Sequence, residues 1–483
     1  MKKFKLASLV LAPLFAVLAA CGGGGGGDKA ATPSAPSTPA TVTLSSITVT
    51  TPDNANTVAV GAPSKTLIAT GSYSDGTKKA LTAAAGLVWG PVSSNVLQIA
   101  TNGALTAKAV GTETVTATVD KVVGSLAITV TAPWMNVAAG GYQTVARKAD
   151  GNLYSWGSNI KGQLGDSSTT DRNAPVLVAG SGGSWKQVAV GDQFVVAVRT
   201  DGTLWAWGYN QDGQLGDGTQ VNRAVPTQIG TAKDWNVVAA GRAHALALKV
   251  NGNLYAWGRN DRGQLGDPTL TGNRAVPTKI GALFWSAIAA GDSHSLAIQK
   301  DTNDMYGWGN NLYGQVGNGS RTDVTAPAKS GTQKYTSVAA GAFHSVAITT
   351  SGTLYAWGQN TYRQLGNSFP ADVLAPGPVG TDSNWSQVAA GAEHTIGLRN
   401  DGTLWSWGAN TYGQLGTGGT DASSPQQVGT GTNWKSVAAG MSHSVGLKSD
   451  DTLWAWGRSL EGQVGDGKTP NPQYAPVPVN IPN

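Results

Sequence analysis

Hydrophobic and polar residues alternate along short segments between residues 41 and 132, as in LSSITVT, TETVTATV and SLAITVTA. Such alternation places apolar side chains on one face of a strand and polar side chains on the other. Thr and Val dominate these segments, and both suit half-buried strand positions. Asp75-Gly76 and Asn102-Gly103 mark tight turns between them. The pattern predicts a small β-sandwich over residues 41–132.

A second pattern begins at Trp134 and recurs seven times, at intervals of about 50 residues. Each copy holds four short apolar segments, which in the third copy are WNVVAAG, HALALKV, NLYAWG and VPTKIG. Asn-Gly, Asp-Gly or Ser-Gly joins the middle two in most copies, which is a strong hairpin signal. The fourth copy, with KDTNDM, and the seventh, with Asp450-Asp451, depart from it and predict looser turns.

The third strand of each copy carries an aromatic residue, a small residue and a tryptophan in succession. Trp205 and Trp207 therefore point to one face of the sheet and Ala206 to the other. A sheet with one bulky and one small face stacks well on copies of itself, and stacking around an axis gives a β-propeller. The small residues are Ser155, Ala206, Ala256, Gly307, Ala356, Ser406 and Ala455. We predict seven blades over residues 133–483.

The recurring elements VAAGxxHS, DGTLWxWG and NxxGQLG resemble the regulator of chromosome condensation repeat family from Trp134 to the end. The resemblance implies a seven-bladed propeller, often closed by pairing the two chain ends within one blade, so that Pro476–Val479 would close the ring. Residues 41–132 resemble the bacterial immunoglobulin-like group 2 domain through Ala69–Thr77, the Trp89 strand and Asn102–Thr112. That resemblance implies a spacer, or in some members a ligand-binding domain. The predicted fold is all-β: a seven-bladed β-propeller preceded by a small immunoglobulin-like β-sandwich.

The N-terminus predicts export. Residues 1–20 combine a basic start with an apolar run of about 15 residues, which is shorter than the roughly 20 that a membrane span needs. Leu18–Cys21 resembles the lipobox of bacterial lipoproteins, which implies cleavage before Cys21 and a diacylglycerol on its sulfur. By the same resemblance Gly22 favours the outer membrane or cell surface, and residues 21–40 would form the lipidated, flexible tether. An ordinary signal peptide with an incidental cysteine is the alternative.

Composition narrows the function classes. Three of the positive charges in the formal net charge of +5 belong to Lys2, Lys3 and Lys5 of the leader. The mature chain is therefore nearly neutral, which argues against nucleic-acid binding. Cys21 is the only cysteine, so no intramolecular disulfide can form. We expect a monomer whose fold rests on packing.

All five histidines occupy one repeat position, where the first two copies hold Gln143 and Phe194 instead. Equivalent positions in seven blades are about 50° apart around the axis, so most are too distant to share a metal with ligands at about 2 Å. We interpret the histidines as structural groups that hydrogen-bond a neighbouring loop. They are His244, His294, His344, His394 and His443.

We expect no metal, cofactor or catalytic residue. The chain has no calcium loop, phosphate-binding glycine loop or nucleophile elbow. A hydrolase site built from dispersed carboxylates on a propeller stays open as an alternative.

Variable loops carry the functional prediction. The frame repeats, but the two residues before GQLG differ between copies, and variable loops on a rigid frame usually hold recognition sites. Tyr313, Tyr362 and Tyr412 fall in consecutive copies and would form an aromatic arc, with Arg262 and Arg363 nearby. Tyr and Arg are enriched in binding hot spots. Local packing of exposed tyrosines is the alternative.

Together these observations predict a lipid-anchored protein of the bacterial cell envelope that presents a propeller to a protein partner, such as a secreted enzyme or a surface protein. The resemblance includes propellers that inhibit secreted enzymes. It also implies guanine-nucleotide exchange as an alternative, which the export signal disfavours. An extracellular enzyme acting on polysaccharide is the third possibility.

Overall fold

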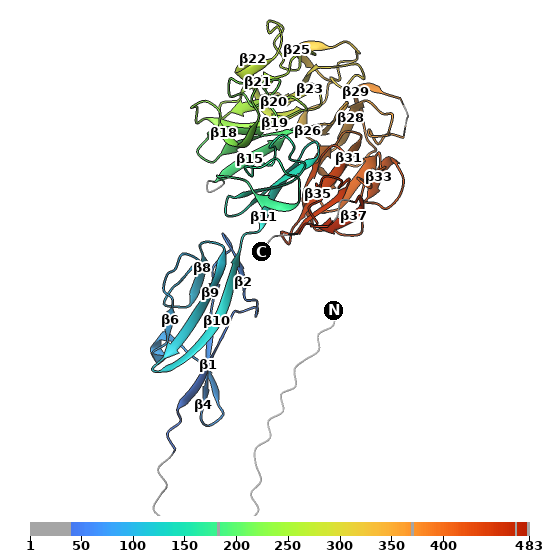
Figure 1. The fold of residues 1–483 in the computed structure, drawn as a ribbon. Helices are drawn as coiled ribbons and strands as arrows, with labels where there is room; N and C mark the ends of the chain where they lie inside the picture. Colours follow the sequence, from blue (N-terminus) through green and yellow to red (C-terminus); the bar gives the residue numbers. More distant parts are fainter. Residues whose placement is uncertain (1–39, 181–183, 369–370, 469–470, 481–483) are drawn as a thin grey trace, which may run out of the picture.

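The computed structural model describes residues 40–180, 184–368, 371–468 and 471–480. Cys21 and the leader lie outside these residues. The described part is built from strands, together with the short 3-10 helix η1 (Ala83–Ala85), so the all-β prediction is confirmed (Figure 1). No helix in this part combines the length and the apolar character needed to cross a bilayer.

The N-terminal strands form three small sheets, β1-β4-β5, β2-β10-β9-β6 and β3-β8-β7, around one apolar core. Leu97, Leu105, Val115 and Ile128 are fully buried in it, and Trp89 is nearly so. A sandwich is therefore present, while its membership of the bacterial immunoglobulin-like group stays a prediction. The strands are β1 (Leu44–Thr50), β2 (Thr57–Ala59), β3 (Lys65–Thr66), β4 (Ile68–Tyr73), β5 (Lys78–Ala80), β6 (Val88–Gly90), β7 (Leu97–Ile99), β8 (Ala104–Ala107), β9 (Gly111–Val119) and β10 (Val122–Thr131).

The remaining strands form the seven predicted blades: five four-stranded sheets, and one seven-stranded sheet that comprises two blades joined through β22. In chain order the blades consist of β11 (Trp134–Ala139), β12 (Gln143–Lys148), β13 (Leu153–Gly157) and β14 (Arg172–Leu177); β15 (Trp185–Val190), β16 (Phe194–Arg199), β17 (Leu204–Gly208) and β18 (Arg223–Gln228); β19 (Trp235–Ala240), β20 (His244–Lys249), β21 (Asn253–Gly258) and the first part of β22 (Arg274–Ala290); the last part of β22, β23 (His294–Gln299), β24 (Met305–Gly309) and β25 (Val324–Lys329); β26 (Tyr335–Ala340), β27 (His344–Thr349), β28 (Leu354–Gly358) and β29 (Val373–Pro378); β30 (Trp385–Ala390), β31 (His394–Arg399), β32 (Leu404–Gly408) and β33 (Ala422–Gln427); and β34 (Trp434–Ala439), β35 (His443–Lys448), β36 (Leu453–Gly457) and β37 (Gln473–Pro478).

Blades stack as the bulky and small faces of the third strand predict. Trp257 of the third blade is fully buried in one apolar cluster with Ala206 and Leu204 of the second blade. Its indole Nε1 also donates to the carbonyl of Gln214 in that blade, at 2.9 Å. Trp207 meets Trp185 edge-on within its own blade, with ring centroids 5.9 Å apart. The aromatic residues therefore supply both packing area and directional bonds between blades.

The outermost strand of every blade carries a proline as its fourth residue. Proline has no N–H to donate and suits edge strands, where it discourages pairing with another chain. The seven prolines are Pro175, Pro226, Pro277, Pro327, Pro376, Pro425 and Pro476. Strand addition at the rim is thus disfavoured.

The ring closes differently from the sequence-based expectation. β37 pairs with β36 inside the last blade, and the first strand of the propeller, β11, pairs only within the first blade. Pro476–Val479 therefore does not exchange strands with the N-terminal part. The seam is instead a face-to-face contact in which Val479, Leu447 and Val464 pack with Trp134 and Trp156. Every blade is one contiguous segment of chain.

The seam repeats the hydrogen bonds found between other blades. Trp156 Nε1 donates to Gln463 O at 3.0 Å, as Trp357 Nε1 donates to Gln315 O at 2.9 Å. The backbone N–H of Met441 donates to Gly140 O at 3.0 Å. Closure therefore needs no strand exchange, because the seam is a seventh copy of the same interface.

Seven glycines line the axis where the blades approach most closely. A Cβ on Gly440 would lie 2.5 Å from the carbonyl oxygen of Gly140 in the next blade, and a Cβ on Gly191 would lie 2.6 Å from that of Gly241. Each glycine faces the next in the same way, and the series returns to its start. The members are Gly140, Gly191, Gly241, Gly291, Gly341, Gly391 and Gly440. We call this set the glycine ring.

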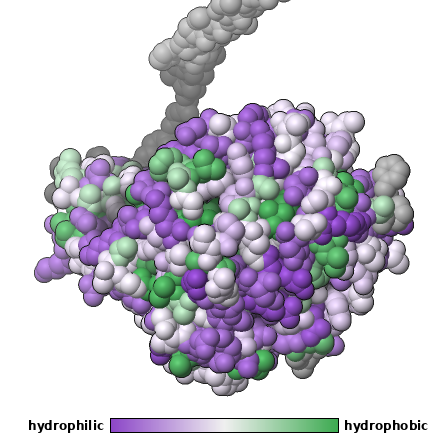
Figure 2. All heavy atoms as spheres, turned by 90° about the horizontal axis from the view of Figure 1, so that it is seen from above, coloured by the Kyte–Doolittle hydropathy of each residue, from purple (hydrophilic) through white to green (hydrophobic). Residues whose placement is uncertain are grey.

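Surface hydrophobicity on the side shown in Figure 2 is spread among small groups that hydrophilic residues separate. A continuous apolar patch larger than a few hundred Å² would mark a large interaction surface. Contacts on this side must therefore combine apolar with polar groups.

Candidate interaction face

One end of the propeller gathers the variable segments of every repeat. Phe194, the first residue of β16, pairs with Gly208, the last residue of β17, and Gly208 pairs with Arg223 at the start of β18. The turn between the first two strands of a blade therefore lies at the same end as the loop between its last two strands. We call this end the loop face. The opposite end, the hairpin face, carries the hairpins between the second and third strands.

The loops of the loop face are internally braced. In the second blade Asn210 Oδ1 accepts the N–H of Leu215 at 2.9 Å. Its Nδ2 donates to Asp217 Oδ1, Thr219 O and Val221 O, each at 3.1 Å. The equivalent Asn159 and Asn311 make the same kind of contacts. Loops fixed in this way present their variable residues with little loss of conformational entropy on binding.

The five histidines lie beneath the loop face and join neighbouring blades. His294 Nε2 lies 2.9 Å from Ser345 Oγ in the next blade. That hydroxyl gives its hydrogen to Gln315 O, at 2.8 Å, so the histidine donates from Nε2. The same contact joins His244 to Ser295, His344 to Thr395, His394 to Ser444 and His443 to Thr144. The partner is thus a hydroxyl on a strand of the next blade and not a loop.

Burial keeps these imidazoles neutral. Desolvation lowers the pKa of His244 to about 4 and the pKa values of the other four histidines to about 3. Neighbouring imidazoles add to the lowering at His294, His344 and His394. Their Nδ1 atoms have no hydrogen-bond partner among the described residues. No group of three or more His, Cys, Asp or Glu side chains in the described part is arranged to hold a metal ion.

The two blades without histidine carry a matching change in the next blade. After Gln143 the following blade has Val195 in place of the hydroxyl, and after Phe194 it has Ala245. Wherever histidine is present, serine or threonine follows in the next copy, including from the seventh copy back to the first. This pairing of histidine with a hydroxyl could have been predicted by comparing the repeats. It also indicates that the last blade is a neighbour of the first.

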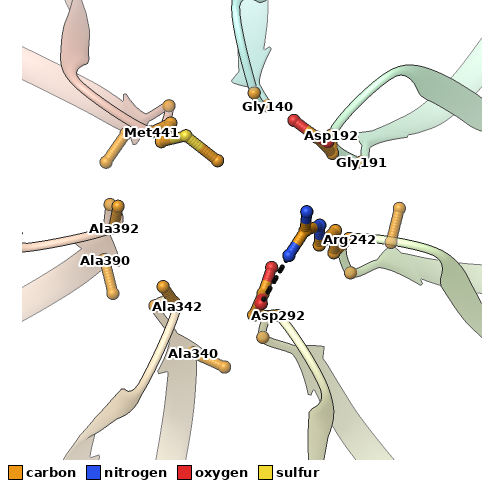
Figure 3. Close-up of a pocket in the computed structure, with 18 of the residues that line it drawn as sticks. Gly140, Gly191, Asp192, Arg242, Asp292, Ala340, Ala342, Ala390, Ala392 and Met441 are labelled. Carbon is orange, nitrogen blue, oxygen red and sulfur yellow. Dashed lines mark hydrogen bonds and ion pairs between the residues drawn. The ribbon is translucent and has the colours of Figure 1, made fainter. Parts of the chain in front are cut away.

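The axial opening of the loop face is divided by chemistry (Figure 3). Asp192, Arg242 and Asp292 lie on one side of it, and Ala342, Ala392 and Met441 on the other. Arg242 Nη1 lies 3.5 Å from Asp292 Oδ2. Desolvation raises the pKa values of Asp192 and Asp292, with Arg242 opposing the shift in both.

The cavity at this opening measures about 120 Å³. Pockets for drug-sized ligands span about 300–1,000 Å³, so it has room for a single side chain and not for a cofactor.

The predicted tyrosine arc lies on the loop face and is longer than the sequence indicated. Tyr313 packs against Phe343 of the next blade, with ring centroids 5.4 Å apart. The guanidinium of Arg458 lies over Tyr412 at 5.4 Å and over Tyr142 at 4.7 Å. Tyr362 is 39% exposed. We define the aromatic arc as Tyr313, Phe343, Tyr362, Tyr412, Arg458 and Tyr142.

Three members of the arc were missed from sequence because they lie outside the two positions before GQLG. Phe343 and Tyr142 occupy the third residue of the G-x-x turn after the first strand, and Arg458 directly follows the Trp-Gly pair. Both positions vary between copies while their neighbours repeat. That variation was a usable signal, since it is the same one that singled out the tyrosines.

The two arginines assigned to the arc have other partners, although Arg363 directly follows Tyr362 in the chain. Arg262 Nη1 pairs with Asp323 Oδ2 at 3.3 Å and belongs to a charged sector formed by Asp192, Arg242, Arg259, Asp261, Arg262 and Asp292. Arg363 replaces the first glycine of GQLG at φ 64°, a left-handed conformation that costs a non-glycine residue about 1 kcal/mol. Its Nη1 donates to Ser368 O at 3.3 Å, within its own loop.

Comparison with known protein families assigns the chain to a family. It belongs to the RCC1-like domain family, whose model matches residues 87–367. Models of the regulator of chromosome condensation (RCC1) repeat match residues 351–398 and 401–447, and a second such model matches 385–414 and 434–463. The repeat family predicted from sequence is confirmed.

Curated relatives match over short stretches. The ultraviolet-B receptor UVR8 of Arabidopsis thaliana is 37% identical over 94 residues, which are 19% of this chain and 21% of that protein. The human E3 ubiquitin-protein ligase HERC2 is 36% identical over 99 residues, 20% of this chain and 2% of that protein. The match spans about a fifth of the first relative and far less of the second.

Solved structures show the same fold. Human WBSCR16 is 23% identical, with a TM-score of 0.62, over 68% of this chain and 94% of that one. Yeast RCC1 (Prp20), solved with Kap60 bound, is 22% identical, with a TM-score of 0.62, over 72% of this chain and 84% of that one. Prp20p of Saccharomyces cerevisiae, in a structure whose description names binding to Gsp1p and histones, is 23% identical, again with a TM-score of 0.62, over 72% and 88%.

Proposed function

We propose that the chain is a lipid-anchored envelope protein whose loop face binds another protein. The observation that carries the proposal is the aromatic arc: ring side chains from blades four to six and blade one, with Arg458 of blade seven, gather on one end of a rigid frame. Exposed and half-buried tyrosine with arginine on braced loops is the composition of binding hot spots. The charged sector beside the arc adds specificity and orientation.

The course of the chain supports this choice of face. β10 ends at Thr131 and the propeller begins at Trp134, which pairs with Lys148 at the hairpin face. The last strand also ends there, since Pro478 pairs with Trp454. Both chain ends thus leave the loop face free, and a tether on the sandwich would hold the opposite end toward the membrane.

The binding partners of proteins with a similar fold support the proposal that the partner of this chain is a protein. Yeast RCC1 was solved with Kap60 bound to it, and the description of Prp20p names Gsp1p and histones as what it binds. Each is a protein. The small axial cavity and the neutral, buried histidines favour binding over catalysis.

Replacing Tyr313, Tyr362 and Tyr412 with alanine is expected to weaken partner binding by more than about 100-fold, since each hot-spot truncation typically costs about 2 kcal/mol. The partner would first be captured from the envelope fraction of the source cells with the full chain, and its affinity then measured by calorimetry. Replacing Tyr73, an aromatic residue of the sandwich, with alanine is the matched control. Unchanged affinity in the triple variant would remove the loop face as the binding site.

The anchor is tested separately. Cys21→Ala is expected to release the protein from the membrane pellet into the soluble fraction, because stable anchoring needs two or more acyl chains. Fractionation followed by immunoblotting measures this. A variant that still sediments with membranes would contradict lipid attachment at Cys21, and partner binding by the soluble variant would show that binding and anchoring are independent.

A further inference from the structure

The seven junctions between neighbouring blades on the loop face share one plan. The second loop residue of each blade lies beside groups of the next blade. Five of these residues have a partner in the next blade: Lys161 with Tyr209, Asp212 with Asn273, Arg262 with Asp323, Tyr313 with Phe343, and Tyr412 with Arg458. Glu461 pairs instead with Arg458 of its own blade. Among the described residues Tyr362, between the fifth and sixth blades, has no side-chain partner.

Only the backbone N–H of Tyr362 forms a hydrogen bond, to Gln364 Oε1 at 3.0 Å, and its ring has no partner among the described residues. Its junction also holds Glu393, at the position that Phe343 occupies against Tyr313. Within the described part Glu393 makes no ion pair and no side-chain hydrogen bond. Burial, and secondarily the nearby carboxylate of Asp421, raise the pKa of Glu393. A half-buried carboxylate without a counter-ion is an unfavourable arrangement that a cation would relieve.

The surroundings favour a cation as well. Across the axial opening from this junction lie two half-buried carboxylates, Asp192 and Asp292, against the single Arg242. Arg363, which follows Tyr362, donates to Ser368 O in its own loop. Together with Glu393, the inner turns of the loop face therefore bear more negative than positive charge. An aromatic ring face also attracts cations through its quadrupole.

We propose that the junction of Tyr362 and Glu393 binds a lysine or arginine side chain of the protein partner. Tyr362 covers the aliphatic stem and cationic head of that side chain, and the Glu393 carboxylate is its counter-ion. Apolar residues that flank the cation in the partner lie on the rest of the aromatic arc. This inference rests on the proposed function and specifies the chemistry of the partner surface.

A displayed library of random peptides, selected on the immobilised full chain, tests the proposal with peptides in place of the partner. Enriched peptides are expected to carry Lys or Arg next to apolar residues. Their affinity should fall about tenfold or more in Glu393→Gln, as when one side of a charge-assisted contact is removed. Tyr362→Ala should weaken them similarly, whereas Tyr362→Phe, which keeps the ring, should bind nearly as the parent does.

Asp301→Asn is the matched control, because it removes the same charge from an exposed hairpin-face position. Enriched peptides without Lys or Arg, acidic peptides, or equal binding to Glu393→Gln and the parent would each overturn the proposal. Peptides lost in the triple tyrosine variant but retained by Glu393→Gln would leave the proposed function standing without this site. Peptides unaffected by the triple variant would remove both. Thermal unfolding of each variant confirms that it is folded.

Discussion

Acidification from pH 7 to about pH 5 is expected to lower the free energy of unfolding of the propeller by about 9 kcal/mol. All five histidines have folded-state pKa values of about 3 to about 4, below the unfolded value of 6.5. Below pH 6.5 the unfolded chain therefore binds more protons than the folded one, and stability falls as the pH falls. Each histidine contributes nearly 1.4 kcal/mol per pH unit, down to its folded pKa.

The expected loss is comparable to the whole stability of a typical domain, about 5–15 kcal/mol, so the propeller should be only marginally stable near pH 5. Hydrogen bonds outweigh desolvation and hold the pKa values of Asp166 and Asp217 below the ordinary 3.8, outside this window. Urea unfolding followed by tryptophan fluorescence at the two pH values measures the change.

The chain supplies its own control. His244→Phe with Ser295→Ala copies the natural pair Phe194 and Ala245 and removes one titrating group without leaving an unpaired hydroxyl. The pH-dependent loss should then shrink by about a fifth, or about 2 kcal/mol. Equal pH dependence in the variant and the parent would show that the histidines do not govern acid stability.

Adding one methyl group to the glycine ring at the seam is expected to destabilise the fold by about 3 kcal/mol. In Gly440→Ala the new Cβ would lie 2.5 Å from the carbonyl oxygen of Gly140, which is backbone and cannot rotate away, and still closer to the buried ring of His443 in its own blade. Both the His443 ring and the first blade would have to shift. Gly419→Ala is the matched control, because nothing lies within 4 Å of its Cβ position and its cost should stay within about 0.5 kcal/mol.

Urea midpoints of the two alanine variants compare them directly. Similar midpoints would mean that the seam is looser than the other interfaces and that the ring is not closed at the axis. The Cβ of Gly391→Ala would meet His394 of its own blade and Gly440 O of the next blade in the same way, so this variant reports on an internal interface. An equal loss in Gly440→Ala and Gly391→Ala would show that the seam is as tight as that interface. The result therefore reports on closure, which distinguishes a propeller from an open stack of the same repeats.

The blade architecture was predictable because it depends on local pattern. The alternation of Trp205, Ala206 and Trp207 decides which face of the strand is bulky, and the hairpin pairs mark where strands turn. The continuity of β22 was not foreseen. Its blade link reads GALF, and these residues continue the strand, with Phe284 paired to Asn253, whereas polar residues such as Lys233 and Asp234 turn the chain at the preceding link.

Contacts between blades were harder to foresee. Tyr313 and Phe343 are 30 positions apart, and only the register of the stacked sheets brings their rings together. Closure was predicted by family resemblance and was wrong in its mechanism, since β37 stays within its own blade. The pairing of His443 with Thr144 indicated the actual mechanism of closure, because it joins the last copy directly to the first across the seam.

Because each blade is one contiguous segment of chain, the order of the blades around the ring does not depend on which blade comes first in the sequence. A circular permutant that opens at any blade link except the one inside β22, and that joins the segment after β37 to Trp134, would cut no sheet, because no sheet combines segments from both ends of the propeller. The chain ends lie on the hairpin face in every such arrangement. A sandwich could then be attached to a different blade, which would rotate the aromatic arc about the axis relative to the tether while leaving the binding residues unchanged.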